Sequence, residues 1–377
     1  MHREKRRHDE ADESRVKIAL IIPSLSAGGA ERVVSVLANE WSNTTERETH
    51  LITFTNIPES YLVSENVRRF NALGGTRETP GAFEYVVVAR RIRNYILSNH
   101  VDYVVSFLDK FNVFVLGSLM FSDVPVFVCE RNSPWRKRSR WLRFAKRCLY
   151  PFAKGVVVQT HRAIEPTRVK TGARRVVAIP NPIAPLQIGS EVSEKQNVIL
   201  NVGRLVPQKN QAFLLEAFAR SQIDDWSLAI AGSGPLRNDL VELAVSLGVQ
   251  DKVIFVGQTN DIGEWYRRAR IFCLSSDYEG FPNALLEAMS FGLACVSTDC
   301  DTGPRELLGE GAAGLLVKVG DREGLSNALC QLVSDERGRR EFGEEAHRRS
   351  KAYDSSIVAE RFFEVLLDSD KNKTGSG

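Results

Sequence analysis

Short apolar runs alternate along the first half of the chain with segments in which apolar residues recur at helical spacing. The apolar runs have the length of buried strands and lie at residues 16–22, 49–54, 102–107, 124–129, 155–158 and 176–179. Residues 30–41 are typical of the segments between them, because Val33, Val34 and Leu37 would share one face of a helix. This alternation predicts a parallel sheet with helices on both faces, of the Rossmann-like type.

A second domain of the same α/β class is indicated further along the chain. Pro180-Asn181-Pro182 and the polar stretch up to Gln196 have the composition of a linker. Strand-like runs then return at residues 197–202, 228–231, 253–256, 271–274, 294–297 and 314–317. We predict a disordered charged tail at residues 1–14, an N-terminal domain at 15–184, a C-terminal domain at 195–354 and a terminal helix at 355–368. The length of 377 residues and the ordinary composition, 43% hydrophobic and 26% charged, suit two soluble domains.

Residues 275–292 join one of these strands to a helix and read Ser-Ser-Asp-Tyr-Glu-Gly-Phe-Pro-Asn-Ala-Leu-Leu-Glu-Ala-Met-Ser-Phe-Gly. Gly280 allows a tight turn, and Pro282 suits the first helical turn, where its missing N–H would have no partner anyway. The backbone amides of residues 281–284 are then expected to face the loop. A helix start of this kind attracts an anion.

Two carboxylates flank this helix start. Glu279 precedes the helix, and Glu287 lies within its apolar length, where an unpaired charge is costly. Sugar or ribose hydroxyls would be suitable partners, because an ionised carboxylate only accepts hydrogen bonds. The alternative stays open that Glu279 caps the helix and Glu287 pairs with an arginine.

A pair of cations follows the strand at residues 197–202. Arg204 and Lys209 would lie at the carboxyl end of that strand, where α/β proteins bind ligands, and they suit a diphosphate leaving group. They would stabilise the negative charge that develops as the bond to the phosphate breaks. An isolated pair of this kind would be read as a solvated loop, but Glu279 and Glu287 favour a binding site.

Glycines at other strand ends are candidates for close approach to a ligand. Gly232 and Gly234 end one strand of the second domain, and Gln258 follows the next one. Gly28 and Gly29 occupy the corresponding loop of the first domain, where they would let phosphates or an acceptor approach the backbone. An ordinary turn is the safer interpretation of Gly28-Gly29 alone.

Residues 131–154 contain nine Lys or Arg and no acid, although the whole chain has a formal net charge of only +3. Aromatic residues such as Trp135, Trp141 and Phe144 interleave with these cations. A basic helix of this kind suits the membrane interface or a diphosphate head group. The alternative is a surface helix whose apolar stripe faces the core. Nucleic acid is not expected as a partner, because no recognised binding motif accompanies the charge.

Two acids of the first domain, Asp109 and Glu130, each follow a strand end. They are candidates to orient or deprotonate an acceptor hydroxyl.

Several other chemistries are disfavoured. The Gly-x-Gly-x-x pattern at residues 232–236 has Arg237 in place of the third glycine of a dinucleotide fingerprint, which leaves an NAD enzyme as a minor alternative. The chain has six cysteines without a Cys-x-x-Cys pair, as expected of reduced thiols in the cytosol. No apolar run approaches the length that crosses a bilayer.

Glu279, seven intervening residues and Glu287, with Gly-Phe-Pro-Asn after the first glutamate, resemble the signature of family 4 retaining glycosyltransferases. The resemblance implies the GT-B fold, two Rossmann-like domains that face each other across a cleft, with the terminal helix crossing back onto the first. It implies that Arg204 and Lys209 contact the donor diphosphate, Glu279 the sugar hydroxyls and Glu287 the ribose, while the strand ends at Gly232 and Gln258 hold the base. Retention of configuration, front-face attack and independence of metal are implied by the family alone, and Asp299-Cys300-Asp301 is accordingly not read as a metal motif.

Three further segments, at residues 106–112, 130–132 and 302–305, are similar to the subgroup that adds N-acetylgalactosamine or related sugars to polyprenyl-diphosphate glycans. Many relatives have a histidine near the position of Asp109, and its absence here leaves the identity of any base open.

The expected function is transfer of a hexose or N-acetylhexosamine from a nucleotide diphosphate sugar, with UDP as the expected nucleotide, to a lipid-linked glycan. The catalytic candidates are Arg204, Lys209, Glu279 and Asp109. The donor candidates are Gly28, Gly29, Arg204, Lys209, Gly232, Gly234, Gln258, Glu279, Gly280, Phe281, Pro282, Asn283 and Glu287. The acceptor and membrane candidates are Glu130, Arg131, Arg136, Arg138, Arg140, Trp141 and Arg143. The expected place is the inner face of the cell membrane. Alternatives are a nucleotide-sugar epimerase on the same fold and a membrane-bound sugar-nucleotide sensor or scaffold.

Overall fold

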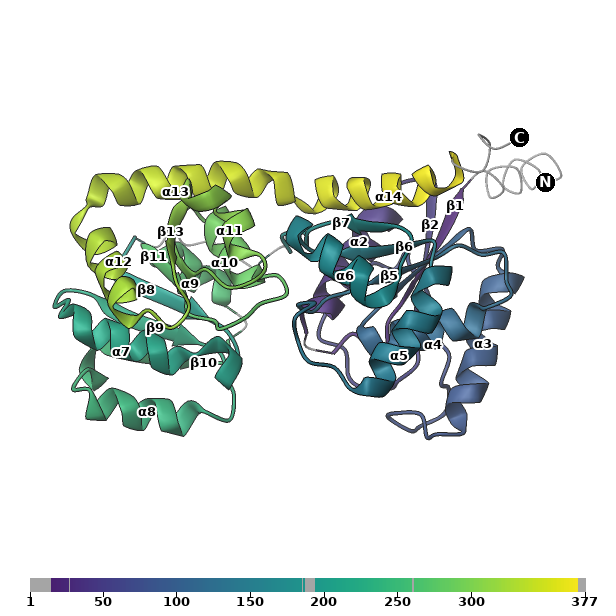
Figure 1. Ribbon diagram of the computed structural model, residues 1–377, viewed down its shortest axis with the longest axis horizontal. Coiled ribbons are helices and arrows are strands. Elements are labelled where there is room, and N and C mark those ends of the chain that lie inside the picture. Colours follow the sequence, from purple (N-terminus) through teal and green to yellow (C-terminus); the bar gives the residue numbers. More distant parts are fainter. Residues whose placement is uncertain (1–14, 27, 185, 187–193, 260, 372–377) are drawn as a thin grey trace. The chain divides into compact units, whose positions relative to one another are not determined.

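The computed structural model describes residues 15–26, 28–184, 186, 194–259 and 261–371 (Figure 1). The predicted tail at residues 1–14 and most of the predicted linker lie outside the described residues. The chain divides into two compact units, one formed by residues 1–184 with 355–377 and the other by residues 185–354.

The first unit is built on a parallel sheet with the strand order β3-β2-β1-β4-β5-β6-β7. Its strands are β1 (Val16–Ile21), β2 (Arg47–Thr53), β3 (Arg68–Asn71), β4 (Tyr103–Phe107), β5 (Val126–Cys129), β6 (Gly155–Val158) and β7 (Val176–Ala178). Its α-helices are α2 (Gly29–Ser42), α3 (Glu84–Ser98), α4 (Asp109–Leu119), α5 (Arg140–Leu149), α6 (Ile164–Thr171) and α14 (Ser355–Lys371). Six of these strands were predicted, and the edge strand β3 was missed because most of its side chains are polar and exposed.

Two apolar cores cover the two faces of this sheet. One contains residues of α3, α4 and α5, and the other contains residues of α2 and α14. The terminal helix α14 is held to α2 by Trp41, whose indole N–H donates to the Ala359 carbonyl at 3.0 Å and whose ring meets Phe362 edge-on. Residues far apart in sequence therefore complete this unit.

The second unit is built on a parallel sheet with the strand order β10-β9-β8-β11-β12-β13. Its strands are β8 (Val198–Val202), β9 (Ser227–Ala231), β10 (Val253–Gly257), β11 (Ile271–Leu274), β12 (Ala294–Thr298) and β13 (Gly314–Val317). Its α-helices are α7 (Gln211–Ser221), α8 (Arg237–Ser246), α9 (Ile262–Arg268), α10 (Asn283–Ser290), α11 (Pro304–Leu307), α12 (Arg322–Ser334) and α13 (Glu336–Ser350). The predicted fold class, two doubly wound parallel-sheet α/β domains, is confirmed.

Each sheet has one place where the order of the strands reverses. In the first unit the reversal lies between β1 and β4, and in the second between β8 and β11. Loops that leave the carboxyl ends of such a strand pair diverge to opposite faces and leave a crevice, which is where open α/β sheets bind ligands. The loop after β8 contains Arg204 and Lys209, and the loop after β11 contains Glu279.

Candidate active site

An ion pair joins the two loops at the reversal point of the second sheet. Lys209 Nζ lies 2.6 Å from Glu279 Oε1, and the Ser276 hydroxyl donates to the same oxygen at 2.6 Å. Glu279 is only 4% exposed, so these two donors offset the cost of burying its charge. The second carboxylate oxygen, Oε2, accepts no hydrogen bond from the described residues, which leaves it for a ligand.

Further hydrogen bonds join the same two loops. The Asp277 amide donates to the Gln208 carbonyl at 3.0 Å, and the Gln208 side chain donates to the Tyr278 carbonyl at 2.8 Å. The Ser275 hydroxyl donates to the Lys209 carbonyl at 2.8 Å. The positions of Lys209 and Glu279 are therefore set together, as a preorganised site requires.

A third loop, after β12, is in contact with the Glu279 loop. The Thr302 hydroxyl donates to the carbonyl of Glu279. Gly303 has a φ of +98°, and a Cβ at this position would lie 2.3 Å from Cδ of Pro282. Position 303 therefore admits glycine alone if the Glu279 loop is to keep its path.

Arg204 differs from Lys209 in its surroundings. Its side chain is exposed, and among the residues described it forms no ion pair. Its backbone is fixed, because its carbonyl accepts from the Gln211 side chain at 3.2 Å. A fixed backbone with an unpaired guanidinium suits a ligand that brings its own negative charge.

Glu287 lies in α10 with its side chain buried against α9. The hydroxyl of Tyr266, itself buried, donates to Glu287 Oε2 at 2.9 Å and lies 3.2 Å from the Ala284 carbonyl. A tyrosine hydroxyl therefore takes part in binding this carboxylate, a partner that the sequence analysis did not name. The role of Glu287 towards a ribose stays a prediction.

The start of α10 differs from the prediction in its details. The helix begins at Asn283, with Pro282 as its N-cap residue rather than in its first turn. The Asn283 amide donates to the Phe281 carbonyl at 3.0 Å, so this amide does not face the loop as an open donor. Phe281 is buried and packs near Tyr353, while Gly280 lies between it and Glu279.

The two glycines after β9 pack against the backbone of the loop that contains Arg204. A Cβ at Gly232 would lie 2.0 Å from the Gly203 carbonyl oxygen, and one at Gly234 would lie 2.3 Å from the Leu205 carbonyl oxygen. These glycines therefore make room for the backbone of the Arg204 loop. Gln258 is exposed after β10, and its Oε1 accepts from the Ser233 hydroxyl at 3.5 Å.

Four side chains form a buried charged cluster in the first unit. Lys146 of α5 lies 2.7 Å from Glu130 and 3.4 Å from Asp109, and Arg138 also pairs with Asp109. The Tyr150 hydroxyl donates to the other oxygen of Glu130. The cluster ties helix α5 to the carboxyl ends of β4 and β5.

The two carboxyl groups of this cluster have opposite pKa shifts. Burial and the neighbouring Asp109 raise the pKa of Glu130, against the opposing effect of Lys146 and Tyr150. Burial disfavours the charge of Asp109, but Lys146 and Arg138 outweigh it and lower the pKa of Asp109. Because a carboxylate with a lowered pKa is a weak base, this environment suits Asp109 for orienting an acceptor hydroxyl better than for deprotonating it.

The predicted basic segment has an inner and an outer face. Arg138 and Lys146 point inward to the carboxylates, and Arg131 donates to Asn181 at 2.6 Å and lies over the Phe107 ring. The side chains exposed on the outer face include Arg136, Arg140, Trp141, Arg143 and Phe144. Trp141 is 65% and Phe144 is 70% exposed, so the aromatic residues of α5 are not core residues.

Side chains of the protein itself fill the space beside Gly28 in the first unit. The Tyr61 hydroxyl donates to the Gly28 carbonyl at 3.0 Å, and the Glu31 carboxylate lies where a Cβ at Gly28 would be. Burial raises the pKa of Glu31, although backbone hydrogen bonds from Glu31 and Ala30 oppose the shift. The start of α2 thus already has a carboxylate of its own, which disfavours phosphate binding there.

Comparison with known proteins relates the second unit to a family of enzymes. Residues 186–349, nearly the whole second unit, match the family described as "Glycosyl transferases group 1". This match and the relatives named as glycosyltransferases identify the chain as a glycosyltransferase. This glycosyltransferase is 29% identical over 370 residues to the GalNAc-alpha-(1->4)-GalNAc-alpha-(1->3)-diNAcBac-PP-undecaprenol alpha-1,4-N-acetyl-D-galactosaminyltransferase of Campylobacter jejuni, across 94% of the chain and 99% of the relative.

Solved structures show the same fold at low sequence identity. Sucrose-phosphate synthase from Thermosynechococcus elongatus has a TM-score of 0.78 at 18% identity, covering 95% of this chain and 100% of that chain. The HepE protein of Anabaena, solved in complex with UDP, has a TM-score of 0.77 at 17% identity, covering 94% and 100%. The predicted GT-B fold and the prediction of a glycosyltransferase are confirmed.

Neither a metal-binding cluster nor a membrane-spanning helix is found among the described residues of this glycosyltransferase. Within the described ranges, no group of three or more His, Cys, Asp or Glu side chains is arranged to hold a metal ion, and Asp299 pairs with Arg305. No α-helix in the described part has both the length and the apolar character needed to cross a bilayer.

Proposed function

We propose that this glycosyltransferase transfers a hexose or N-acetylhexosamine from a UDP-sugar to a lipid-linked glycan, with retention of configuration and without a metal. The observation that supports it best is the Lys209–Glu279 pair beside the exposed Arg204, at the strand reversal of the second sheet. The two cations suit the diphosphate of a nucleotide sugar. The carboxylate, which has one oxygen without a hydrogen bond from the described residues, suits the sugar hydroxyls.

In this proposal each group has one task. Glu279 uses Oε1 for Lys209 and Ser276, and it offers Oε2 to the sugar hydroxyls of the donor. Arg204 and Lys209 stabilise the charge on the leaving diphosphate, and Lys209 is already held in place by Glu279, so it needs little reorganisation when the bond breaks. The leaving phosphate then accepts the proton of the attacking hydroxyl. The solved HepE complex with UDP supports the choice of nucleotide.

The lipid-linked acceptor is proposed on two grounds. The relative from Campylobacter jejuni acts on an undecaprenol-diphosphate glycan, and its similarity covers 94% of this chain. In addition, helix α5 presents Arg140, Trp141 and Arg143 on one exposed face. Cations beside aromatic rings suit an anionic membrane surface, and we place the enzyme at the inner face of the cell membrane.

The donor is tested by release of the nucleoside diphosphate. We expect release from one UDP-sugar in the presence of a chelator, and faster release when a membrane lipid extract supplies the acceptor. UDP-, GDP- and ADP-sugars would be compared with and without added metal. Product analysis without acceptor separates an epimerase, which would change the sugar without releasing the nucleotide. Release that requires metal, or no release from any donor by the folded protein, contradicts the proposal.

The membrane face is tested by vesicle sedimentation. We expect Arg140→Gln with Arg143→Gln to weaken binding to phosphatidylglycerol vesicles about 30-fold, since each cation near an anionic surface contributes about 1 kcal/mol. Donor hydrolysis without acceptor should be unchanged. Arg337→Gln with Arg340→Gln, which removes two exposed cations of α13, is the matched control. Equal losses in the two double variants would show that binding follows net charge and not this face.

A further inference from the structure

Helix α3 of the first unit is apolar on two sides. Val88 and Ile92, one helical turn apart, pack into the core that α3, α4 and α5 share over one face of the sheet (Figure 1). Phe83, Val86 and Val87 lie on the outer side, where they are 91%, 54% and 45% exposed. The core accounts for the inner side of this helix and leaves the outer side unexplained.

The neighbouring helices show the same excess of exposed apolar side chains. Ten of the seventeen exposed large apolar side chains among the described residues lie between residues 83 and 152, the segment that contains α3, α4 and α5. They include Phe121 after α4, Trp141 and Phe144 on α5, and Phe152 just beyond it. Single exposed apolar residues are normal on a protein surface, but a concentration of this kind marks an interaction surface.

The charges on these three helices are almost all positive. Together α3, α4 and α5 contain eight Lys or Arg and only two acids, Glu84 and Asp109. Asp109 belongs to the buried charged cluster, and Glu84 pairs with Arg77. Helices α2 and α14, on the other face of the sheet, contain six acids and three Lys or Arg. The first unit therefore has one cationic and one acidic helical layer, and the cationic layer suits an anionic partner.

The exposed parts of α3 and α4 belong to one surface. The Arg93 guanidinium of α3 donates to the Met120 carbonyl at 3.1 Å and to the Phe121 carbonyl at 3.3 Å. These bonds hold the turn after α4 against α3, with the Phe121 side chain 91% exposed. Helix α5 packs on the other side of α4, so the surface extends across all three helices (Figure 1).

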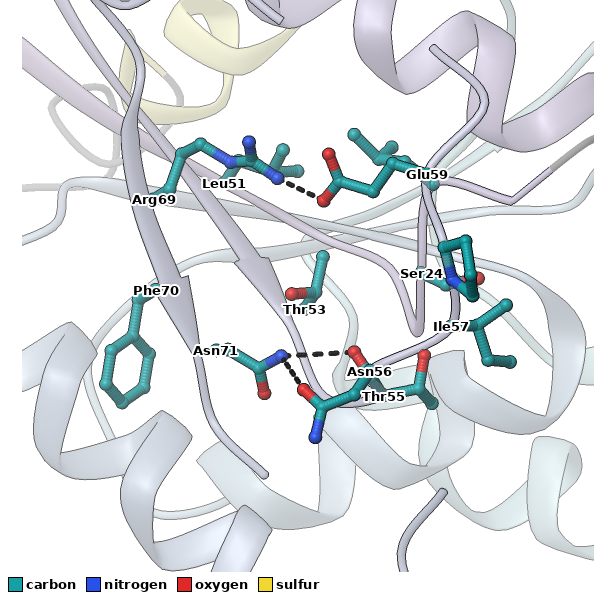
Figure 2. A pocket seen from close by; sticks show the side chains of 12 residues that line it. Ser24, Leu51, Thr53, Thr55, Asn56, Ile57, Glu59, Arg69, Phe70 and Asn71 are labelled. Atoms are coloured by element: carbon teal, nitrogen blue, oxygen red, sulfur yellow. Dashed lines mark hydrogen bonds and ion pairs between the residues drawn. The ribbon is translucent and has the colours of Figure 1, made fainter. Parts of the chain in front are cut away.

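The pocket at the carboxyl ends of β2 and β3 does not compete for an anionic partner. Figure 2 shows that Arg69 of this pocket pairs with Glu59, and these two are the charged residues among the described ones that line it. By contrast, Arg90 of α3, Lys110 of α4 and Arg140 of α5 are exposed and form no ion pair with the described residues. The unpaired cations of this side of the first unit thus belong to the helical layer.

We propose that the outer sides of α3, α4 and α5 form one contact surface for an anionic lipid bilayer, an inference that rests on the proposed function and extends its membrane contact from α5 to α3. Aromatic and aliphatic side chains enter the interface between head groups and acyl chains, while cations beside them bind lipid phosphates. The apolar side chains are spread over three helices, and a bilayer contacts all three at once. Exposed valines and a phenylalanine at the start of α3 give a nucleic acid nothing to pair with.

This surface borders the edge of the sheet that contains the acceptor candidates. In a parallel sheet the helices that follow the strands begin at the carboxyl ends of the strands and run back along the sheet. Phe83 at the start of α3, Lys110 of α4 and Trp141 of α5 therefore flank the edge where Asp109 and Glu130 lie. A bilayer on this surface places its head groups, and with them the diphosphate of a lipid-linked acceptor, beside that edge.

Sedimentation of the full-length protein with vesicles of phosphatidylglycerol and phosphatidylcholine tests the α3 contact. Phe83→Ser with Phe121→Asn removes two rings that are 91% exposed, and asparagine tolerates the φ of +67° at position 121. We expect this variant to bind the vesicles about tenfold more weakly than the wild type, because apolar surface that enters the bilayer is lost. Arg90→Gln removes one exposed cation of α3 and should weaken binding about fivefold.

A matched control removes apolar residues from elsewhere on the same unit. Leu62→Ser with Ile357→Ser changes two exposed apolar side chains outside the cationic layer and should bind like the wild type. Equal loss in this control and in the Phe83 variant, or wild-type binding by both α3 variants, overturns the inference. No binding of the wild type to these vesicles also overturns it and favours an acidic protein as the partner. Loss in the Arg140 and Arg143 double variant alone would confine the membrane contact to α5.

The proposed function is checked separately in the same variants. Donor hydrolysis without acceptor should be unchanged in the Phe83, Phe121 and Arg90 variants, because none of these residues belongs to the donor site. Hydrolysis by variants that no longer bind vesicles would show that the surface acts on the acceptor side. A wild type that binds vesicles through α3 but releases no nucleoside diphosphate would contradict the proposed function and leave this surface in place.

Discussion

Arg204→Ala is expected to lower turnover by roughly two to three orders of magnitude, the effect of losing one donor that stabilises transition-state charge. The side chain is exposed and forms no ion pair with the described residues, so its loss leaves no buried partner behind. The free energy of unfolding should therefore change by less than about 0.5 kcal/mol. Release of the nucleoside diphosphate at saturating donor gives kcat, and thermal unfolding gives stability.

Lys209→Ala is the informative comparison. It removes a cation of the same site but also leaves Glu279, which is 4% exposed, without its ion-pair partner. Stability should fall together with turnover. Arg220→Ala is the matched control, since Arg220 is an exposed arginine of α7 with a distant ion-pair partner at 3.9 Å. If Arg204→Ala raised KM and left kcat unchanged, Arg204 would bind the donor without stabilising the leaving group.

The fold was largely predictable because parallel strands buried on both faces are continuous apolar runs. The runs at β1, β4 and β11 stand out from their surroundings for this reason. Strand β3 could not be found this way, because Arg68, Arg69 and Asn71 are exposed at the sheet edge and only its pairing with β2 makes it a strand. An edge strand of this kind is formed by its hydrogen bonds to the neighbouring strand, and a single sequence does not show which strand that is.

The residues of the candidate site could be predicted where they follow an apolar strand closely in the sequence. Arg204, Lys209 and Glu279 stand directly after apolar runs, and the order of the strands brings their loops together. Ser276 and Thr302 were missed as supports of Glu279, because a serine or threonine in a loop has no distinctive pattern until its partner is known.

The basic segment shows a different limit. Its charge could be counted from the sequence, but the direction of each side chain could not. Arg138 and Lys146 face Asp109 and Glu130. These partners are far apart in sequence, and Lys146 comes 37 residues after Asp109. The outward-facing Arg140 and Arg143 of the same segment have no such acid beside them in the described structure. Which cations are structural is decided by tertiary contacts.

Lys146→Met is expected to destabilise the protein by about 3–5 kcal/mol, the usual cost of removing one partner from a buried ion pair. Methionine keeps the length and the apolar stem of the side chain, so packing in α5 is preserved. The loss comes from Glu130 and Asp109, which would keep their charges while losing the cation that lies 2.7 and 3.4 Å from them. Urea unfolding followed by tryptophan fluorescence measures it.

The loss should depend on pH with a definite sign. Without Lys146 the pKa of both carboxyl groups in the folded state rises, so the folded protein takes up protons more readily than the unfolded chain. The penalty is then complete above the raised pKa and shrinks as the pH falls towards the ordinary carboxyl range. We expect a larger loss at pH 8 than at pH 5. Arg143→Met, an exposed change on the same helix, should alter stability by less than about 0.5 kcal/mol at either pH. A Lys146→Met penalty that is equal at both pH values would mean that packing, and not the paired charges, accounts for the role of Lys146.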